Sequence, residues 1–137
     1  MLREGMPHSR ILVVDDEEDI RDVARLLLES AGYSVVCVED GRSAIKEVDK
    51  QTFDLVITDM LMPEMDGVEL INELRRRDPG QPIVAISGGG HAPKESYLQI
   101  AHLCGAQVLL AKPFNRDQLV RAVRASGVLP PGESSAN

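Results

Sequence analysis

Aromatic residues are scarce in this chain, which has two phenylalanines, two tyrosines and no tryptophan among its 137 residues. Proteins that bind single-stranded nucleic acid stack the bases on aromatic side chains, so this composition disfavours such a function. Basic residues are also in the minority, because 15 Lys and Arg face 22 Asp and Glu and give a formal net charge of -7. An acidic chain is unsuited to a phosphate backbone or an anionic membrane surface. We therefore expect neither nucleic acid nor membrane as a partner.

Cysteines and long hydrophobic runs are few as well. The two cysteines, Cys37 and Cys104, each lie in apolar sequence, and no Cys–Cys or Cys–His spacing typical of a metal site is present. We expect both to be packed thiols. No apolar run is long enough to span a membrane, and residues 1–10 lack the apolar core of a signal peptide. These absences predict a reducing, cytoplasmic location. The length of the chain suits a single domain.

The hydrophobic pattern alternates between strand-like and helix-like segments. Short apolar and β-branched runs, typical of strands buried on both faces, occur at residues 11–14, 33–38, 55–58, 83–86 and 107–111. An amphipathic helical pattern follows each run; the first has an apolar face of Ile20, Val23, Ala24, Leu27, Leu28 and Ala31. This alternation predicts an α/β, doubly wound fold, a five-stranded parallel sheet with helices on both faces. We expect a lead-in over residues 1–9, the domain over 10–127 and a flexible tail over 128–137.

Chemically reactive side chains occur where the predicted strands end. Asp15 and Asp16 follow the first strand, Asp59 the third, Ser87 the fourth and Lys112 the fifth. Ligands of open parallel sheets bind outside the carboxyl ends of the strands, so we expect these side chains to share one edge. Each alone has an ordinary explanation as a helix cap, a turn residue or a solvated lysine. Four strand ends that carry such residues together argue against coincidence.

These side chains predict a metal-assisted reaction of phosphate. Crowded carboxylates repel one another unless a cation holds them, and Mg²⁺ takes oxygen ligands while keeping several waters. Lys112 adds a positive charge suited to a phosphoryl oxygen, and Ser87 adds a hydroxyl donor. A carboxylate can act as the nucleophile that forms an aspartyl phosphate. The carboxylates, Lys112 and Ser87 together therefore predict phosphoryl transfer. The acids at residues 17–19 are expected to have a different role, because acidic residues are typical of the first turn of a helix.

The chain resembles the receiver domains of two-component response regulators over residues 10–126. The residues that carry the resemblance are Asp15–Asp16, Asp59 with Met62–Pro63 and Asp66–Gly67 behind it, Ser87, and Lys112–Pro113–Phe114. The resemblance implies a sheet order of 2-1-3-4-5 and a cis bond between Lys112 and Pro113. It also implies that Asp59 accepts a phosphoryl group from a histidine kinase or a phosphotransfer protein.

The resemblance further implies roles for the residues around Asp59. Asp16, Asp59 and the backbone carbonyl of Leu61 would bind Mg²⁺ or Mn²⁺, and Asp15 would hold a metal-bound water. Ser87 and Lys112 would engage the phosphoryl oxygens. The protein would then be a phosphoacceptor in signalling and not an enzyme, since it would catalyse only its own phosphorylation and dephosphorylation.

A downstream protein partner is also implied, docking on the face made by the helix after residues 88–90, the strand ending at Ala111 and the last helix. Two positions depart from the usual pattern: Leu109 stands where many receivers have Tyr or Phe, and three glycines, Gly88 to Gly90, follow Ser87. Because glycine permits many backbone conformations, we expect the glycine run to respond to phosphorylation more than Leu109. No output domain is recognisable after Ser126, which predicts a single-domain regulator.

Two alternatives to a phosphoacceptor receiver remain open. A phosphatase of the haloacid-dehalogenase type places its aspartate nucleophile after the first strand, with a second acid two residues later. Here Asp59 follows the third strand, and the residue two positions later is Leu61. A receiver-like module could also bind protein partners without accepting phosphate. Mg²⁺-dependent labelling by a small phosphodonor would separate the three functions.

Overall fold

A computed structural model describes residues 9–60, 67–87 and 108–130 of the chain. Five parallel strands form one sheet in the order β2-β1-β3-β4-β5, which confirms the predicted order. The strands are β1 (Arg10–Val14), β2 (Ser34–Val38), β3 (Leu55–Asp59), β4 (Ile83–Ser87) and β5 (Val108–Ala111). The described helices are α1 (Glu18–Ser30), α2 (Gly41–Lys50), α3 (Gly67–Arg77) and α5 (Arg116–Ala125). The predicted fourth helix lies outside the described residues.

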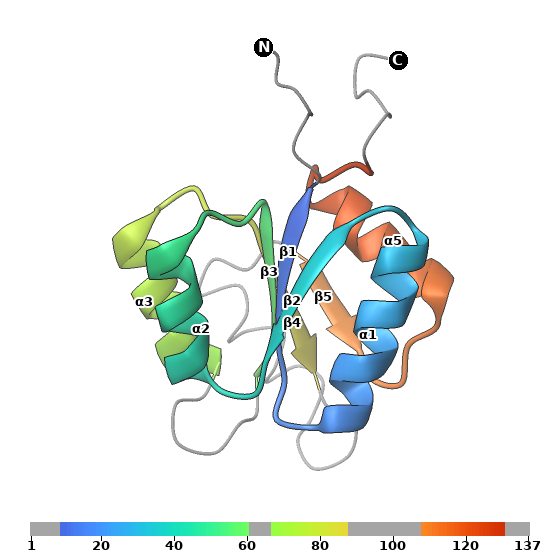
Figure 1. Ribbon diagram of the computed structural model, residues 1–137, viewed down its shortest axis with the longest axis horizontal. Coiled ribbons are helices and arrows are strands. Elements are labelled where there is room, and N and C mark those ends of the chain that lie inside the picture. Colours follow the sequence, from blue (N-terminus) through green and yellow to red (C-terminus); the bar gives the residue numbers. More distant parts are fainter. Residues whose placement is uncertain (1–8, 61–66, 88–107, 131–137) are drawn as a thin grey trace.

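Helices cover both faces of the sheet, with α1 and α5 on one face and α2 and α3 on the other (Figure 1). The inner strand β1, which lies between β2 and β3, contributes to both layers because successive side chains of a strand point to opposite faces. Ile11 and Val13 pack in the cluster beneath α1 and α5. Leu12 and Val14 pack in the cluster beneath α2 and α3. All four side chains are fully buried, as expected for a parallel strand between two helical layers.

The inner face of α1 is narrower than the sequence predicts. Ala24 and Leu28 are buried, whereas Val23 is 44% exposed. Successive helical residues are about 100° apart, so Val23 is turned away from Ala24 to the edge of the apolar face. The placement of Val23 on the buried face is therefore wrong.

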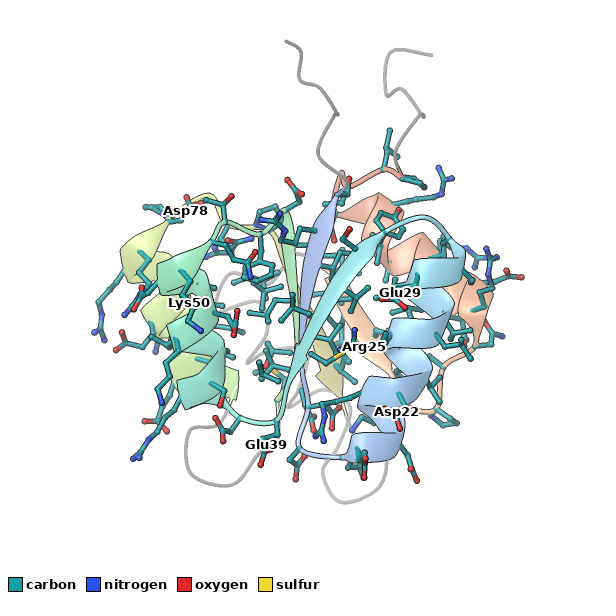
Figure 2. The ribbon with its side chains drawn as sticks, in the orientation of Figure 1. Asp22, Arg25, Glu29, Glu39, Lys50 and Asp78 are labelled. Atoms are coloured by element: carbon teal, nitrogen blue, oxygen red, sulfur yellow. The ribbon has the colours of Figure 1, made fainter. Side chains whose placement is uncertain are left out.

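Polar contacts also connect α1 to its surroundings. Arg25 and Glu29 form an exposed ion pair, and Arg25 reaches the edge strand β2 to donate to the Val35 carbonyl at 3.3 Å (Figure 2).

Local signals at helix ends agree with the sequence. The Asp40 side chain accepts a hydrogen bond of 2.8 Å from the Ser43 backbone N–H and caps α2. Asn115 and Gln118 form a capping box at the start of α5. Gly32, just after α1, has a φ of 102°, which favours glycine.

The packed domain extends further along the chain than expected. Val128 is buried in the core, and the Tyr33 hydroxyl donates to its carbonyl at 3.0 Å. The Ser9 hydroxyl donates to the Leu129 carbonyl at 2.7 Å. The predicted start of a flexible tail at residue 128 is therefore too early, because a turn at Gly127 (φ 88°) returns the chain to the core.

Two further observations concern burial. In the described segments, no helix combines the length and the apolar composition needed to cross a membrane. Cys37 is half-buried against the cluster beneath α1, and burial raises the pKa of its thiol. The packed-thiol prediction is confirmed for Cys37, whereas Cys104 lies outside the described residues.

Candidate functional site

The register of the sheet brings the predicted site residues to one edge. Thr58 pairs with Val14, so the next residues, Asp59 and Asp15, end neighbouring strands side by side. Asp59 in turn pairs with Ile86, and Ser87 pairs with Ala111, the residue before Lys112. The carboxyl ends of four strands therefore deliver their chemistry to the same edge, as the sequence predicts.

Three carboxylates form the centre of this edge. Asp15, Asp16 and Asp59 each offer one oxygen, and these oxygens all lie within 4.8 Å of one another. Asp15 and Asp59 are buried, at 0% and 3% exposure, whereas Asp16 is exposed. Like charges this close raise the energy of the folded protein unless positive charge compensates them.

Lys112 supplies positive charge to the cluster. Its Nζ lies 2.9 Å from Glu17 Oε1, 3.1 Å from Asp15 Oδ2 and 3.4 Å from Asp59 Oδ2. Burial of the ammonium favours its neutral form, but the three carboxylates outweigh burial and raise the pKa of Lys112. Lys112 therefore stays charged throughout the neutral range. The bond from Lys112 to Pro113 is cis, as predicted.

The loop after β1 fixes Asp15 through backbone contacts. Asp15 Oδ1 accepts a hydrogen bond of 2.9 Å from the Glu17 N–H, and the Arg21 guanidinium donates to the Asp15 carbonyl at 2.8 Å. Asp15 Oδ2 is buried, and it forms an ion pair with Lys112 but no hydrogen bond of good geometry with the described residues. Burial raises the pKa of Asp15, and the Glu17 N–H and Lys112 oppose that rise.

These features fit a hard divalent cation. Such an ion takes carboxylate oxygens and retains waters, and a water on the ion could donate to a buried oxygen such as Asp15 Oδ2. The cluster offers three carboxylates, and one of them, Asp16, is open to solvent. The residues present therefore match Mg²⁺ or Mn²⁺ in charge and in ligand type.

Several predicted site residues lie partly or wholly outside the described residues. Ser87 ends β4 at the expected position, but its side chain is not among the parts described. Leu61, Met62–Pro63 and Asp66 lie outside the described residues, as do the glycines at 88–90. Leu109 is half-buried and packs against the cluster beneath α2 and α3. The roles expected of Ser87 and Leu61 stay predictions.

Three residues near the cluster take roles that the sequence did not suggest. Glu17 was expected only to favour the start of α1, yet it contacts Lys112. Arg21 holds the Asp15 carbonyl from the second turn of α1. Gly67, a motif residue, leaves no space for a side chain beside the Asp59 carbonyl. A run of acids gives no signal for the Glu17 contact, because it depends on the loop after β5 lying close to α1.

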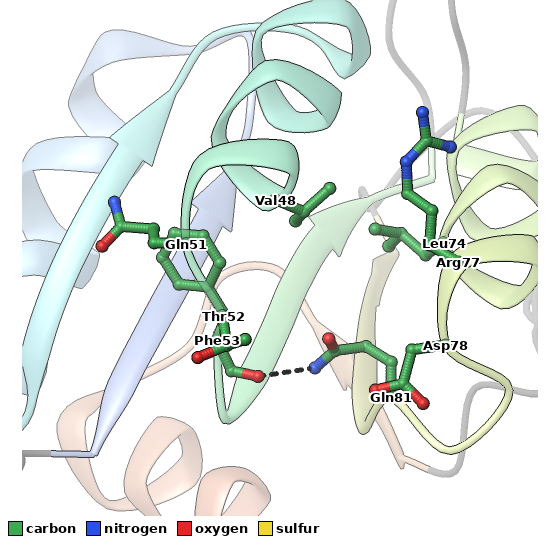
Figure 3. A pocket seen from close by; sticks show the side chains of 8 residues that line it. All are labelled: Val48, Gln51, Thr52, Phe53, Leu74, Arg77, Asp78 and Gln81. Carbon is green, nitrogen blue, oxygen red and sulfur yellow. Dashed lines mark hydrogen bonds between the residues drawn. The ribbon is translucent and has the colours of Figure 1, made fainter.

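A separate pocket lies at the opposite edge, where the strands begin (Figure 3). Its volume is about 280 Å³, and its lining is Val48, Gln51, Thr52, Phe53, Leu74, Arg77, Asp78 and Gln81. Gln81 donates to the Phe53 carbonyl at 3.1 Å, and Arg77 is paired with Asp49 and Glu73. Because Gln81 and Arg77 are engaged in these contacts, and the ion pair of Arg77 with Asp49 connects α3 to α2, we assign this pocket to the packing of α2 against α3. The edge that carries Asp15, Asp16 and Asp59, called the acid edge below, is the better candidate site.

Comparison with known proteins agrees with this geometry. Residues 11–124 match the family described as the response regulator receiver domain. The match covers most of the chain, and the chain therefore belongs to the response regulator receiver family of two-component signalling. Receiver domains of this family are phosphoacceptors in signalling, and they interact with histidine kinases or phosphotransfer proteins.

Two curated relatives illustrate the range of proteins that carry this domain. The transcriptional regulatory protein GlrR of Escherichia coli is 34% identical over 115 residues, which are 84% of this chain and 25% of the relative. An uncharacterized 14.6 kDa protein of Leptolyngbya boryana is 36% identical over 114 residues, which are 83% of this chain and 86% of the relative. This chain thus spans about a quarter of GlrR but most of the smaller protein.

Solved structures share the fold. The chemotaxis protein CheY4 of Vibrio cholerae has a TM-score of 0.80 at 32% identity, covering 90% of this chain and all of that chain. A receiver domain protein of Clostridium thermocellum has a TM-score of 0.78 at 28% identity, covering 86% of this chain and 93% of that chain.

Proposed function

We propose that Asp59 accepts a phosphoryl group from a histidine kinase or a phosphotransfer protein. The observation that carries this proposal is the placement of Lys112, whose ammonium bridges Asp59 and Asp15 at the carboxyl edge of the sheet. A buried carboxylate with a cation beside it and a candidate metal cluster around it has the surroundings that a phosphoryl acceptor needs.

The transfer forms one bond to phosphorus and breaks one. A carboxylate oxygen of Asp59 attacks the phosphorus of a phosphohistidine and forms a P–O bond while the P–N bond breaks. The electron pair of that bond passes to the imidazole nitrogen, which takes up a proton from water. Lys112 neutralises charge on the transferring group, and Ser87 is proposed to donate to one of its oxygens.

Asp16, Asp59 and the Leu61 carbonyl would hold Mg²⁺, with Asp15 holding a water of the ion. When bound, the ion would supply positive charge to the phosphoryl oxygens as charge moves toward them. The buried Asp15 Oδ2, which has no hydrogen bond from the described residues, supports this assignment.

Phosphorylation would then change which proteins this chain binds, or supply the phosphoryl group to a further carrier. The new group carries nearly two negative charges and several acceptor oxygens. We propose that the downstream protein docks on the face that includes β5 and α5. Ser87 would move toward the new group, and the segment from Ser87 to residue 95 would change its exchange of amide hydrogens.

Labelling by a small phosphodonor tests the acceptor. With Mg²⁺ and acetyl phosphate, the wild-type protein should gain one phosphoryl group that hydroxylamine removes. The Asp59→Asn variant should gain none, while Asp22→Asn, a change at an exposed acid of α1, should label normally. Undiminished label on Asp59→Asn would overturn the assignment.

The same experiment separates the alternatives. A phosphatase would release phosphate through many turnovers, and a module that only binds proteins would stay unlabelled with Mg²⁺ present. Circular dichroism of Asp59→Asn should match the wild type, which shows that any loss of label comes from the acceptor and not from unfolding.

A further inference from the structure

We propose that Glu17 is a positioning residue for Lys112. The Glu17 carboxylate attracts the Lys112 ammonium toward the solvent-exposed side of the cluster formed by Asp15, Asp16 and Asp59. This leaves the carboxylates of Asp15 and Asp59 more available to a divalent cation. The inference rests on the proposed function in one respect, because it takes the cluster of Asp15, Asp16 and Asp59 as the cation site.

The distances around Lys112 carry this inference. The shortest contact of Nζ is with Glu17 Oε1, at 2.9 Å, and it is a hydrogen bond. The contact with Asp59 Oδ2 is longer, at 3.4 Å. The Glu17 side chain is 58% exposed, whereas those of Asp15 and Asp59 are 0% and 4% exposed. Lys112 therefore lies between a buried pair of acids and one acid at the surface.

The backbone of Glu17 is anchored while its side chain is not used by the helix. Glu17 is the N-cap residue of α1, in an extended conformation, and its side chain makes no capping hydrogen bond. Ser, Thr, Asp and Asn are the residues that cap helices well, so capping does not explain a glutamate here. The Glu17 N–H donates to Asp15 Oδ1 at 2.9 Å, which ties the position of Glu17 to the cluster itself.

Competition for oxygen atoms links Glu17 to cation binding. The two buried oxygens that Lys112 approaches, Asp15 Oδ2 and Asp59 Oδ2, belong to residues of the candidate cation cluster. An ammonium and a divalent cation cannot both approach these carboxylates closely without repelling each other. Without the Glu17 charge, Lys112 would lean further on Asp15 and Asp59, and cation binding would weaken.

The test compares Mg²⁺ affinity in matched variants by calorimetry, without any phosphodonor. Glu17→Gln should bind Mg²⁺ about two- to fivefold more weakly than the wild type, which is the range expected for a partly exposed ion pair. Glu18→Gln is the control. It removes the same charge from the next residue, and the Glu18 side chain forms no described ion pair with Lys112.

A double-mutant cycle with Lys112→Met decides whether Glu17 acts through Lys112. In the Lys112→Met background, Glu17→Gln should weaken Mg²⁺ binding no more than Glu18→Gln does. An equal loss in both backgrounds would overturn the inference, because Glu17 would then act on the cation directly. A wild-type protein that binds no Mg²⁺ would overturn it as well.

A spectroscopic measurement reports on Lys112 itself. The Cε resonance of Lys112, assigned as the one missing in Lys112→Met, should shift in Glu17→Gln and stay in place in Glu18→Gln. No shift in either variant would contradict the contact. Failure of Asp59 to take label, with Mg²⁺ binding that still depends on Glu17, would reject the proposed acceptor and leave the role of Glu17 intact.

Discussion

Gly67 and Met60 lie so close together that a Cβ added to Gly67 would stand 2.7 Å from the Met60 Cα. The same atom would stand 2.8 Å from the Asp59 carbonyl oxygen. Both neighbours are backbone atoms, which cannot rotate away as a flexible side chain can. The start of α3 is therefore packed directly on the end of β3, where the proposed acceptor lies.

We predict that Gly67→Ala destabilises the protein by about 1–3 kcal/mol, the usual effect of forcing extra volume into a packed site. It should also slow phosphorylation of Asp59, because the end of β3 must shift. Gly80→Ala is the control, since an added Cβ there would meet no heavy atom closer than Asp78 Oδ1, at 3.6 Å. Urea unfolding of the two variants tests this. Equal free energies of unfolding would show that α3 shifts to accommodate the added methyl group at little cost.

Asp16 is predicted to bind Mg²⁺ at a cost to the metal-free protein. Asp16→Ala should weaken Mg²⁺ binding, because a ligand and a charge are lost. It should raise the melting temperature without Mg²⁺, because one of three crowded charges is removed. Thermal melts with and without Mg²⁺ test both parts, with Asp19→Ala, a change at an exposed acid in the first turn of α1, as the control. Equal Mg²⁺ affinity would place the ion elsewhere.

Asp40 should make the stability depend on acidic pH. The backbone N–H of Ser43 lowers the pKa of Asp40 below its usual value of 3.8. The ionised cap is therefore preferred in the folded state, so its contribution is complete above pH 3.8 and is lost as pH falls through the folded pKa. Asp40→Ala should lose about 1 kcal/mol at neutral pH.

The loss in Asp40→Ala should shrink as pH falls below 3.8, where the wild-type cap also becomes protonated. Asp40→Asn keeps a capping oxygen without a titrating group, so it should retain most of the stability at neutral pH. Denaturant melts at several pH values measure all three proteins. A difference between wild type and Asp40→Ala that does not vary with pH would contradict this account.

Tyr33 should secure the chain after α5. Tyr33→Phe removes the donor to the Val128 carbonyl, and the loss of one buried hydrogen bond costs about 1 kcal/mol. Ser30→Ala, which removes an exposed hydroxyl bonded to the Leu27 carbonyl, should cost less. Hydrogen exchange at Val128 should rise in Tyr33→Phe alone, and unchanged exchange would mean that apolar packing holds this segment.

The sheet and the acid cluster could be predicted because they depend on patterns of few residues. A run such as Ile11–Val14 has one reasonable structure, a strand buried on both faces, and Asp15 then falls at its end. Each observed strand differs from its predicted range by one residue at one end; β2, for example, begins at Ser34 and not at Tyr33. The cluster followed because parallel strands align their carboxyl ends.

Contacts between distant segments could not be predicted in this way. The ion pair of Glu17 and Lys112 joins residues 95 positions apart, and it depends on how closely the loop after β5 approaches α1. The hydrogen bond from the Tyr33 hydroxyl to the Val128 carbonyl likewise joins residues 95 positions apart. Val23 was misplaced because a helical pattern does not show how wide a face its neighbours will cover.

The hydrogen bond of 2.7 Å from Ser9 to Leu129 has a consequence for engineering the protein. These two residues lie at the edge where the strands begin, about 16 Å from the acid edge if each of the five residues of β1 rises about 3.3 Å. A short linker between them would join the ends of the packed domain with little strain. A circular permutant could then be opened beside Asp59, so that a fused fluorescent reporter would sit where phosphorylation changes the charge.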